Sequence, residues 1–159
     1  RVRSAMTSQA RAKRTFAAAR RSRNTSIQRL SKAEIMWEMT NVGWTNRRAA
    51  PLTPSPLLVG DELYLVTDAG IASCLDARTG DILWQQRLNG TFSASPVFAD
   101  GRIYFLAEDG VTTVLAPGRQ FRRLATNTLG GATLASMAIA GGSIYVRSAT
   151  HLYRIGATQ

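Results

Sequence analysis

Two residues have side chains that commonly act as a nucleophile, a general base or a metal ligand, and each type occurs once. His151 is the sole histidine and Cys74 the sole cysteine. A catalytic triad or a metal site needs partners at matched spacing, and neither residue has them in the sequence. We therefore predict no catalytic and no metal-binding residue. We expect His151 to be a surface or strand-edge residue and Cys74 a small core residue.

Carboxylates could also move a proton or bind a metal, but here they stand at turn positions. Aspartate is favoured in turns because its side chain accepts hydrogen bonds from nearby backbone N–H groups. We expect this structural role for five aspartates: Asp61, Asp76, Asp81, Asp100 and Asp109. No cofactor-binding residue is assigned.

Two other groups have a chemical interpretation beside a structural one. Three arginines stand close to Phe121 and form either a solvated face or a surface for an anionic or protein partner: Arg119, Arg122 and Arg123. Three serines recur about 40 residues apart, where innermost strands are expected to begin: Ser55, Ser95 and Ser136. They either satisfy backbone groups or contact a ligand.

The charge of the chain is concentrated in its first third. Residues 1–50 hold 12 Lys and Arg against two Asp and Glu, whereas residues 51–159 hold eight of each kind. The net charge of +10 therefore belongs to a basic segment and not to a domain surface. No apolar run approaches the ~18 residues of a transmembrane helix. The first residues also lack the apolar stretch of a secretory signal.

The basic segment, residues 1–37, is rich in Arg, Ala and Ser. Four interpretations stay open: a disordered tail, a non-native stretch from a shifted frame or wrong gene boundary, a nucleic-acid-binding arm, and an organelle transit peptide. Base stacking favours several aromatic residues, but Phe16 is the only one before Trp37. Ser31 and Glu34 fit a capping box, which predicts a short helix at 31–37.

From residue 38 we predict a separate β domain that runs to residue 159. Three prolines between 51 and 56 disfavour helix there. Residues 55–66 align with residues 95–106 and with residues 136–147, at offsets of 40 and 41. Four short strands in a period of ~40 residues are typical of β-propeller blades.

The second strand of each repeat is apolar on successive residues, which indicates that neighbouring blades cover both its faces. We expect one tyrosine in each of these strands to pack between blades: Tyr64, Tyr104 and Tyr145. The predicted strands cover residues 55–60, 62–68, 71–76, 81–88, 95–99, 102–108, 111–116, 120–126, 134–140, 143–148 and 151–155.

The predicted fold is therefore an all-β, partial propeller with blades at about 51–90, 91–130 and 131–156. The third blade lacks a fourth strand, which closed propellers commonly recruit from the other end of the chain. Three blades do not close a ring, because propellers typically need four to eight. We expect a chain of marginal stability, association through open blade faces, or a C-terminal fragment of a longer protein.

Residues 74–84 carry the most distinctive motif, Cys-Leu-Asp-Ala-Arg-Thr-Gly-Asp-Ile-Leu-Trp. Asp76 and Gly80 predict a tight turn, since Asp accepts backbone hydrogen bonds and Gly supplies a positive φ. Together with Thr79 and Trp84 they match the pattern Ala-x-Asp-x-x-Thr-Gly-x-x-x-Trp. The sequence thereby resembles the pyrroloquinoline-quinone-like (PQQ-like) propeller repeat family.

This resemblance covers about residues 42–156. Val42-Gly43-Trp44 looks like the last strand of a preceding blade, and the second blade has Ala116-Pro117-Gly118 in place of the motif. The family's dehydrogenases hold the quinone over a calcium ion, commonly against two adjacent cysteines, with an Asp as base. This chain has no cysteine pair.

The resemblance implies a non-catalytic repeat scaffold for protein interaction, without a cofactor, within a larger exported bacterial protein. Its partners would be a protein or the missing blades, and its compartment the periplasm or the extracellular space. One alternative is a fragment of a PQQ-dependent dehydrogenase that binds PQQ and calcium through missing blades. Another is nucleic-acid binding through the basic segment, which predicts steeply salt-dependent affinity.

Overall fold

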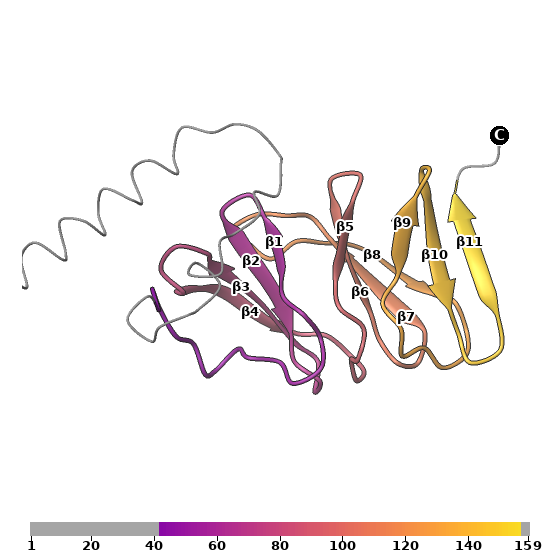
Figure 1. Ribbon diagram of the computed structural model, residues 1–159, viewed down its shortest axis with the longest axis horizontal. Helices are drawn as coiled ribbons and strands as arrows, with labels where there is room; N and C mark the ends of the chain where they lie inside the picture. Colours follow the sequence, from indigo (N-terminus) through magenta and orange to yellow (C-terminus); the bar gives the residue numbers. More distant parts are fainter. Residues whose placement is uncertain (1–41, 157–159) are drawn as a thin grey trace, which may run out of the picture. The chain divides into compact units, whose positions relative to one another are not determined.

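The computed structural model describes residues 42–156, which fall within one compact unit, Val42–Gln159. The basic segment 1–37 and its predicted helix at 31–37 lie outside the described residues. Across the described residues the regular elements are eleven β-strands in three antiparallel sheets, each with its strands in chain order (Figure 1). The all-β prediction is confirmed.

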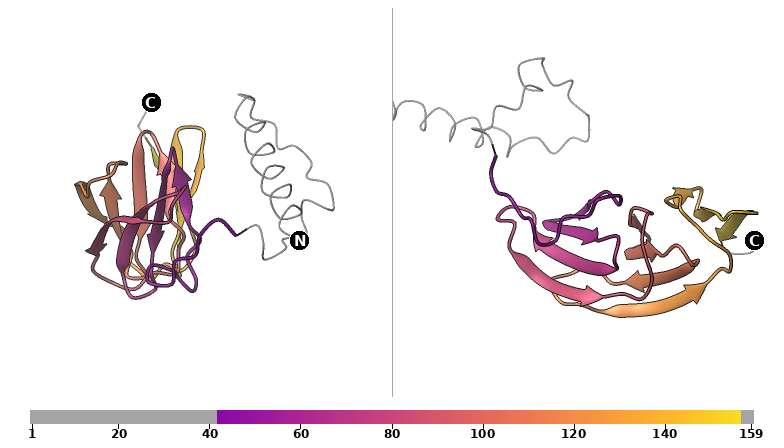
Figure 2. Two further views of the ribbon diagram at one scale, coloured as in Figure 1. Left: turned by 90° about the vertical axis from the view of Figure 1, so that its left-hand side faces the viewer. Right: turned by 90° about the horizontal axis from the view of Figure 1, so that it is seen from below.

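The first blade contains β1 (Leu57–Val59), β2 (Glu62–Val66), β3 (Ile71–Asp76) and β4 (Ile82–Arg87). The second contains β5 (Val97–Ala99), β6 (Arg102–Leu106), β7 (Val111–Leu115) and β8 (Arg123–Thr128). The third contains β9 (Ala138–Ala140), β10 (Ser143–Arg147) and β11 (Leu152–Gly156). In Figure 2 the three sheets follow one another in the order of the chain.

Local turn chemistry places the strands where the repeat predicts them. Asp100 and Gly101 connect β5 to β6 with positive φ at both residues, 47° and 68°. Two such residues make a type I′ hairpin, whose twist matches that of the paired strands. The innermost pair of the second blade therefore forms from residues adjacent in sequence.

The main apolar core lies between the first and second blades. Its buried side chains come from β2, β3, β6 and β7 and from the segments that follow β4 and β6, and they include Tyr64, Cys74 and Phe105. A smaller core joins the second blade to the third around Leu106, Met137 and Val146. Both faces of the second blade are therefore covered, as the apolar second strands predicted, and the predicted packing of Tyr64 between blades is confirmed.

The outer strands differ from the prediction in two places. β8 begins at Arg123 and not at residue 120, so Arg119 and Arg122 lie in the loop before it, together with Phe121. β8 is also exposed along its whole length, whereas the first half of β4 is half-buried against the next blade. The reason is that β11 is the last strand of the third sheet among the described residues, so no fourth strand lies opposite β8.

Candidate interaction site at the blade-to-blade interface

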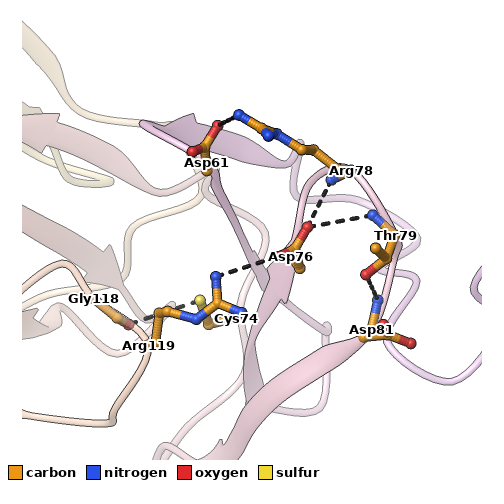
Figure 3. Close-up of polar contacts among 8 residues, drawn as sticks. All are labelled: Asp61, Cys74, Asp76, Arg78, Thr79, Asp81, Gly118 and Arg119. Atoms are coloured by element: carbon orange, nitrogen blue, oxygen red, sulfur yellow. Dashed lines mark hydrogen bonds and ion pairs between the residues drawn. The ribbon is translucent and has the colours of Figure 1, made fainter.

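Asp76 organises the tight turn between β3 and β4 (Figure 3). Its Oδ1 accepts hydrogen bonds from the backbone N–H groups of Arg78, at 3.0 Å, and Thr79, at 3.3 Å. The Gly80 N–H donates to the Asp76 carbonyl oxygen at 2.8 Å, and Gly80 has a φ of +77°. Hydrogen bonds to the carboxylate hold the pKa of Asp76 below its ordinary value; the largest effect comes from the Arg78 N–H, and the Arg119 guanidinium adds to it. Desolvation acts in the opposite direction but is outweighed. The carboxylate thus serves the turn.

Two ion pairs surround this turn. Arg78 Nη2 lies 3.0 Å from Asp61 Oδ1 within the first blade. Arg119 Nη1, from the second blade, lies 3.2 Å from Asp76 Oδ2 and so crosses the interface. The arginine side chains are more than half exposed, and exposed pairs stabilise a protein by only about 0–1 kcal/mol. They orient the loops more than they hold the blades together.

Trp84 joins the first blade to the loop that precedes β8. Its Nε1–H donates to the Gly118 carbonyl oxygen at 3.1 Å, and its ring meets Phe121 edge-on at 5.3 Å between centroids. The Gly118 N–H donates to the Tyr64 hydroxyl at 2.6 Å. Trp84 bonds to a backbone carbonyl, so its contact does not need the Asp-x-x-Thr-Gly pattern, which the second blade lacks.

Burial changes the chemistry of two groups in this interface. It raises the pKa of Tyr64 to about 12 and that of the Cys74 thiol to about 11. The Cys74 Sγ lies 3.8 Å from the Gly118 carbonyl oxygen and is fully buried. Both groups are therefore protonated at neutral pH. Because the thiolate and not the thiol is the nucleophile, Cys74 acts as a small core residue.

Trp44 makes on the first blade the contact that Trp84 makes on the second. Its Nε1–H donates to the Ala77 carbonyl oxygen at 3.1 Å, and its ring covers Gly80 so closely that a Cβ there would lie 2.5 Å away. Asn46 Nδ2 donates to the Gly80 carbonyl oxygen at 3.1 Å. This docking was missed in the sequence, although the 40-residue spacing between Trp44 and Trp84 could have revealed it.

The three recurring serines link the innermost strands of adjacent blades. The Ser55 N–H donates to Ser95 Oγ at 2.9 Å, and the Ser95 N–H donates to Ser136 Oγ at 2.8 Å. Of the two interpretations that the sequence left open, this geometry matches the satisfaction of backbone groups. The hydroxyls of Ser95 and Ser136 each accept from the preceding blade, so the two bonds run in one direction along the chain.

A second repeated contact, also missed in the sequence, lies in the hairpins between second and third strands. Asp68 Oδ2 accepts a hydrogen bond from the Leu52 N–H at 2.8 Å. Forty residues later, Glu108 accepts hydrogen bonds from the hydroxyls of Thr91, at 3.0 Å, and Ser93. The carboxylates tie each hairpin to the segment that enters its blade, and their 40-residue spacing was the available signal.

The remaining residues predicted from sequence stay apart from one another. His151 is exposed, and its Nδ1 lies 2.8 Å from Thr150 Oγ1. Asp100 pairs with Arg102, and Asp109 accepts the Val111 N–H at 3.0 Å. Within residues 42–156, no three His, Cys, Asp or Glu side chains cluster in a way that could hold a metal ion.

Comparisons with known proteins place this fold. A family model described as outer membrane protein assembly factor BamB matches residues 23–157. The match begins earlier than the resemblance at 42–156 that the sequence indicated, and so includes part of the basic segment. No curated protein matches the chain. In the described part of the chain, no helix is long and apolar enough to cross a membrane.

Two solved structures show the same fold. BamB from Moraxella catarrhalis is 19% identical with a TM-score of 0.54, over 63% of this chain and 30% of that one. The quinohemoprotein alcohol dehydrogenase ADHIIG from Pseudomonas putida HK5 is 13% identical with a TM-score of 0.51, over 59% and 16%. The chain thus spans less than a third of either protein, as a partial propeller does. It belongs to the PQQ-like repeat family of β-propeller proteins, the family of the outer membrane protein assembly factor BamB.

Proposed function

We propose that this chain is a non-catalytic PQQ-like repeat scaffold for protein interaction, within a larger exported bacterial protein of the periplasm or the extracellular space. The family model, which describes an assembly factor of the outer membrane, supports both the role and the compartment. The proposal assigns no cofactor to the chain.

The use of the motif's polar groups is the observation that carries this proposal. Asp76 and Thr79 are hydrogen-bonded within their turn, and Trp84 is bonded to the next blade. Within residues 42–156, no buried side-chain nitrogen or oxygen lacks a hydrogen-bond partner. Active sites commonly hold polar groups and perturbed carboxylates ready for a substrate. Here the polar groups are engaged in holding the blades.

Exposed apolar side chains on the innermost strands offer a contact surface. Phe98 is 41% exposed and Ile139 40% exposed, although each lies opposite a residue of an inter-blade core, Ile103 and Ile144 respectively. Leu58 occupies the same position in the first blade and is 60% exposed. Apolar residues that stay exposed between packed blades favour contact with another polypeptide.

Photo-crosslinking in the producing cell tests the scaffold. A photoreactive phenylalanine at Phe98 is expected to yield defined adducts with one or a few proteins, since this position stays exposed. The same residue at buried Phe105 is the matched control and should yield none. Absence of protein adducts at both positions contradicts the scaffold.

Addition of PQQ and calcium separates the scaffold from the dehydrogenase alternative. The scaffold predicts an unchanged quinone absorbance spectrum and no dye reduction in the presence of alcohols. A bound-quinone spectrum with dye reduction by the longer protein that contains this chain would establish the dehydrogenase instead.

A further inference from the structure

The start of β8 and the loop before it carry a group of exposed arginines at the outer edge of the second blade, the β8 arginine cluster: Arg119, Arg122 and Arg123. Arg119 Nη1 lies 3.2 Å from Asp76 Oδ2 (Figure 3). Among residues 42–156, Arg122 and Arg123 form no ion pair. In this part of the chain, no carboxylate neutralises these two guanidinium groups.

The equivalent turn of the first blade has the opposite charge balance. The same backbone hydrogen bond closes both turns: the Asp76 N–H donates to the Asp81 carbonyl oxygen at 2.9 Å, and the Ala116 N–H donates to the Arg122 carbonyl oxygen at 3.0 Å. The first turn, residues 76–81, contains two aspartates and one arginine. The second, residues 116–122, contains two arginines and neither aspartate nor glutamate. Ala116 and Arg122 thus stand where the first turn has its carboxylates.

The second turn does not use its arginines to satisfy its backbone. In the first turn the carboxylate of Asp76 accepts the N–H of Arg78. In the second turn Pro117 has no N–H to satisfy, and the Gly118 N–H donates to the Tyr64 hydroxyl at 2.6 Å. The positive charge of the cluster is therefore available for a partner.

Two of the arginines are held in place by their own chain. Asp76 holds Arg119, and the guanidinium carbon of Arg123 lies 5.9 Å from the centre of the Phe121 ring. A side chain that is already held loses less conformational entropy when a partner binds. A guanidinium group in a fixed orientation can bind a carboxylate through two parallel N–H···O bonds. The geometry thus favours a partner that carries carboxylates.

We propose that the β8 arginine cluster binds an acidic segment of a protein partner. This inference rests on the proposed scaffold function, since it names the chemistry of one partner. Arginine and aromatic residues are enriched together at protein interfaces. Nucleic acid fits less well, because bases stack on open aromatic faces, whereas the Phe121 ring already contacts Arg123 and Trp84. The cluster and the exposed Phe98 lie on opposite edge strands of one sheet, so the scaffold has two separate contact surfaces.

Arginine footprinting on the full 159-residue chain tests this site. Phenylglyoxal modifies accessible guanidinium groups, and mass spectrometry measures the modification of each arginine separately. An oligoglutamate peptide should slow the modification of Arg122 and Arg123 on the order of 10-fold, because hydrogen bonds between charged groups are the stronger ones. The exposed Arg147 and Arg154 of the third blade are the controls and should keep their rates. Equal protection of all four overturns the site, since it reports general charge screening.

Two variants of equal charge give a matched comparison. One carries Arg122→Gln and Arg123→Gln in the cluster, and the other carries Arg147→Gln and Arg154→Gln in the third blade. The peptide concentration that half-protects Arg119 should rise on the order of 10-fold in the first variant and keep its parental value in the second. Equal concentrations in the two variants overturn the proposal, and circular dichroism checks that each variant is folded.

Vesicles that contain phosphatidylglycerol, and a single-stranded DNA oligonucleotide, replace the peptide in parallel mixtures. If either one protects the cluster and oligoglutamate does not, the acidic protein segment is overturned in favour of a membrane or a nucleic acid. Adducts from the photoreactive residue at Phe98, together with equal protection of all arginines, would keep the scaffold and overturn this site. The two failures are therefore distinguishable.

Discussion

Gly118 is the residue on which the first and second blades meet. Its carbonyl oxygen accepts the indole N–H of Trp84, and its own N–H donates to the hydroxyl of Tyr64. A backbone group in this role tolerates sequence change around it, because every residue except proline offers the same N–H and C=O. The blade interface is therefore retained where the repeat motif is degenerate.

Gly80→Ala tests the packing of Trp44 on the motif turn. The substitution is expected to lower the free energy of unfolding by about 1–2 kcal/mol for the left-handed backbone and by about 1–3 kcal/mol more for overpacking. The added Cβ would lie 2.5 Å from the Trp44 ring. Urea denaturation measures the difference.

Gly101→Ala is the matched control, since Gly101 also has positive φ but nothing lies within 4 Å of its Cβ position. Gly101→Ala should lower the free energy of unfolding only by the amount that the left-handed backbone costs. If both alanine variants lose equal stability, or if Trp44→Ala does not remove the excess at Gly80, the ring does not pack as described.

Tyr64 predicts a loss of stability at alkaline pH. Its pKa is about 12 in the folded chain against an ordinary 10.0, because burial opposes the charged form. The resulting stabilisation is fully present below pH 10 and is lost as pH rises toward 12. Near-ultraviolet absorbance should show one tyrosine that ionises near pH 12.

The Tyr64→Phe variant should lose this alkaline dependence. It should also be about 1–3 kcal/mol less stable at neutral pH, because the Gly118 N–H then lacks its acceptor. Both proteins also carry Cys74→Ala, because the raised pKa of that thiol would by itself lower stability at alkaline pH. An identical alkaline profile in the two proteins contradicts the buried hydroxyl.

At the scale of elements, the turn between β3 and β4 is a self-contained unit. Asp76 and Thr79 satisfy its backbone N–H groups, and Gly80 supplies the left-handed conformation. The turn holds the carbonyl of Ala77 where Trp44 can reach it. A short local motif thereby creates the docking surface for the preceding blade.

Asp76→Asn tests the charge in this turn. The pKa of Asp76 is lowered, so its contribution to stability is present above its ordinary value of 3.8 and is lost as pH falls through the folded value. The variant should therefore unfold at lower urea than the parent at pH 7, and the difference should begin to shrink only as the pH falls below 3.8. If the difference in stability between the two proteins does not change with pH, the charge of Asp76 does not contribute to stability.

At the scale of the whole described unit, the three blades are not equally secured. The core between the first and second blades is large, whereas the third blade is attached through the smaller cluster around Met137 and Val146. In repeat proteins, stability is approximately a sum over repeats and their interfaces. The third blade is therefore expected to open first.

Amide hydrogen exchange measures this order. Protection should be greatest in β2, β3 and β6, and least in β9 to β11, because local opening costs least where few apolar contacts break. Uniform protection across the blades at low concentration would contradict the unequal attachment.

The sequence by itself determined the strands, their turns and the family. A 40-residue period, the Asp100-Gly101 hairpin and the residues from Asp76 to Trp84 are local patterns, and neighbouring residues are enough to specify them. The strand starts differ most from the predictions at β9, which begins at Ala138 and not at residue 134, and at β8, where the preceding loop is held by contacts to another blade.

The tertiary structure decided which blade each side chain serves. The bonds of Trp44 to Ala77, Trp84 to Gly118 and Tyr64 to Gly118 join residues 33, 34 and 54 positions apart. Their acceptors are backbone groups or lie in a loop without the motif, so residue types carry little signal of the contact. Only folding brings these residues together, because burial of the apolar faces between blades is what sets their distance.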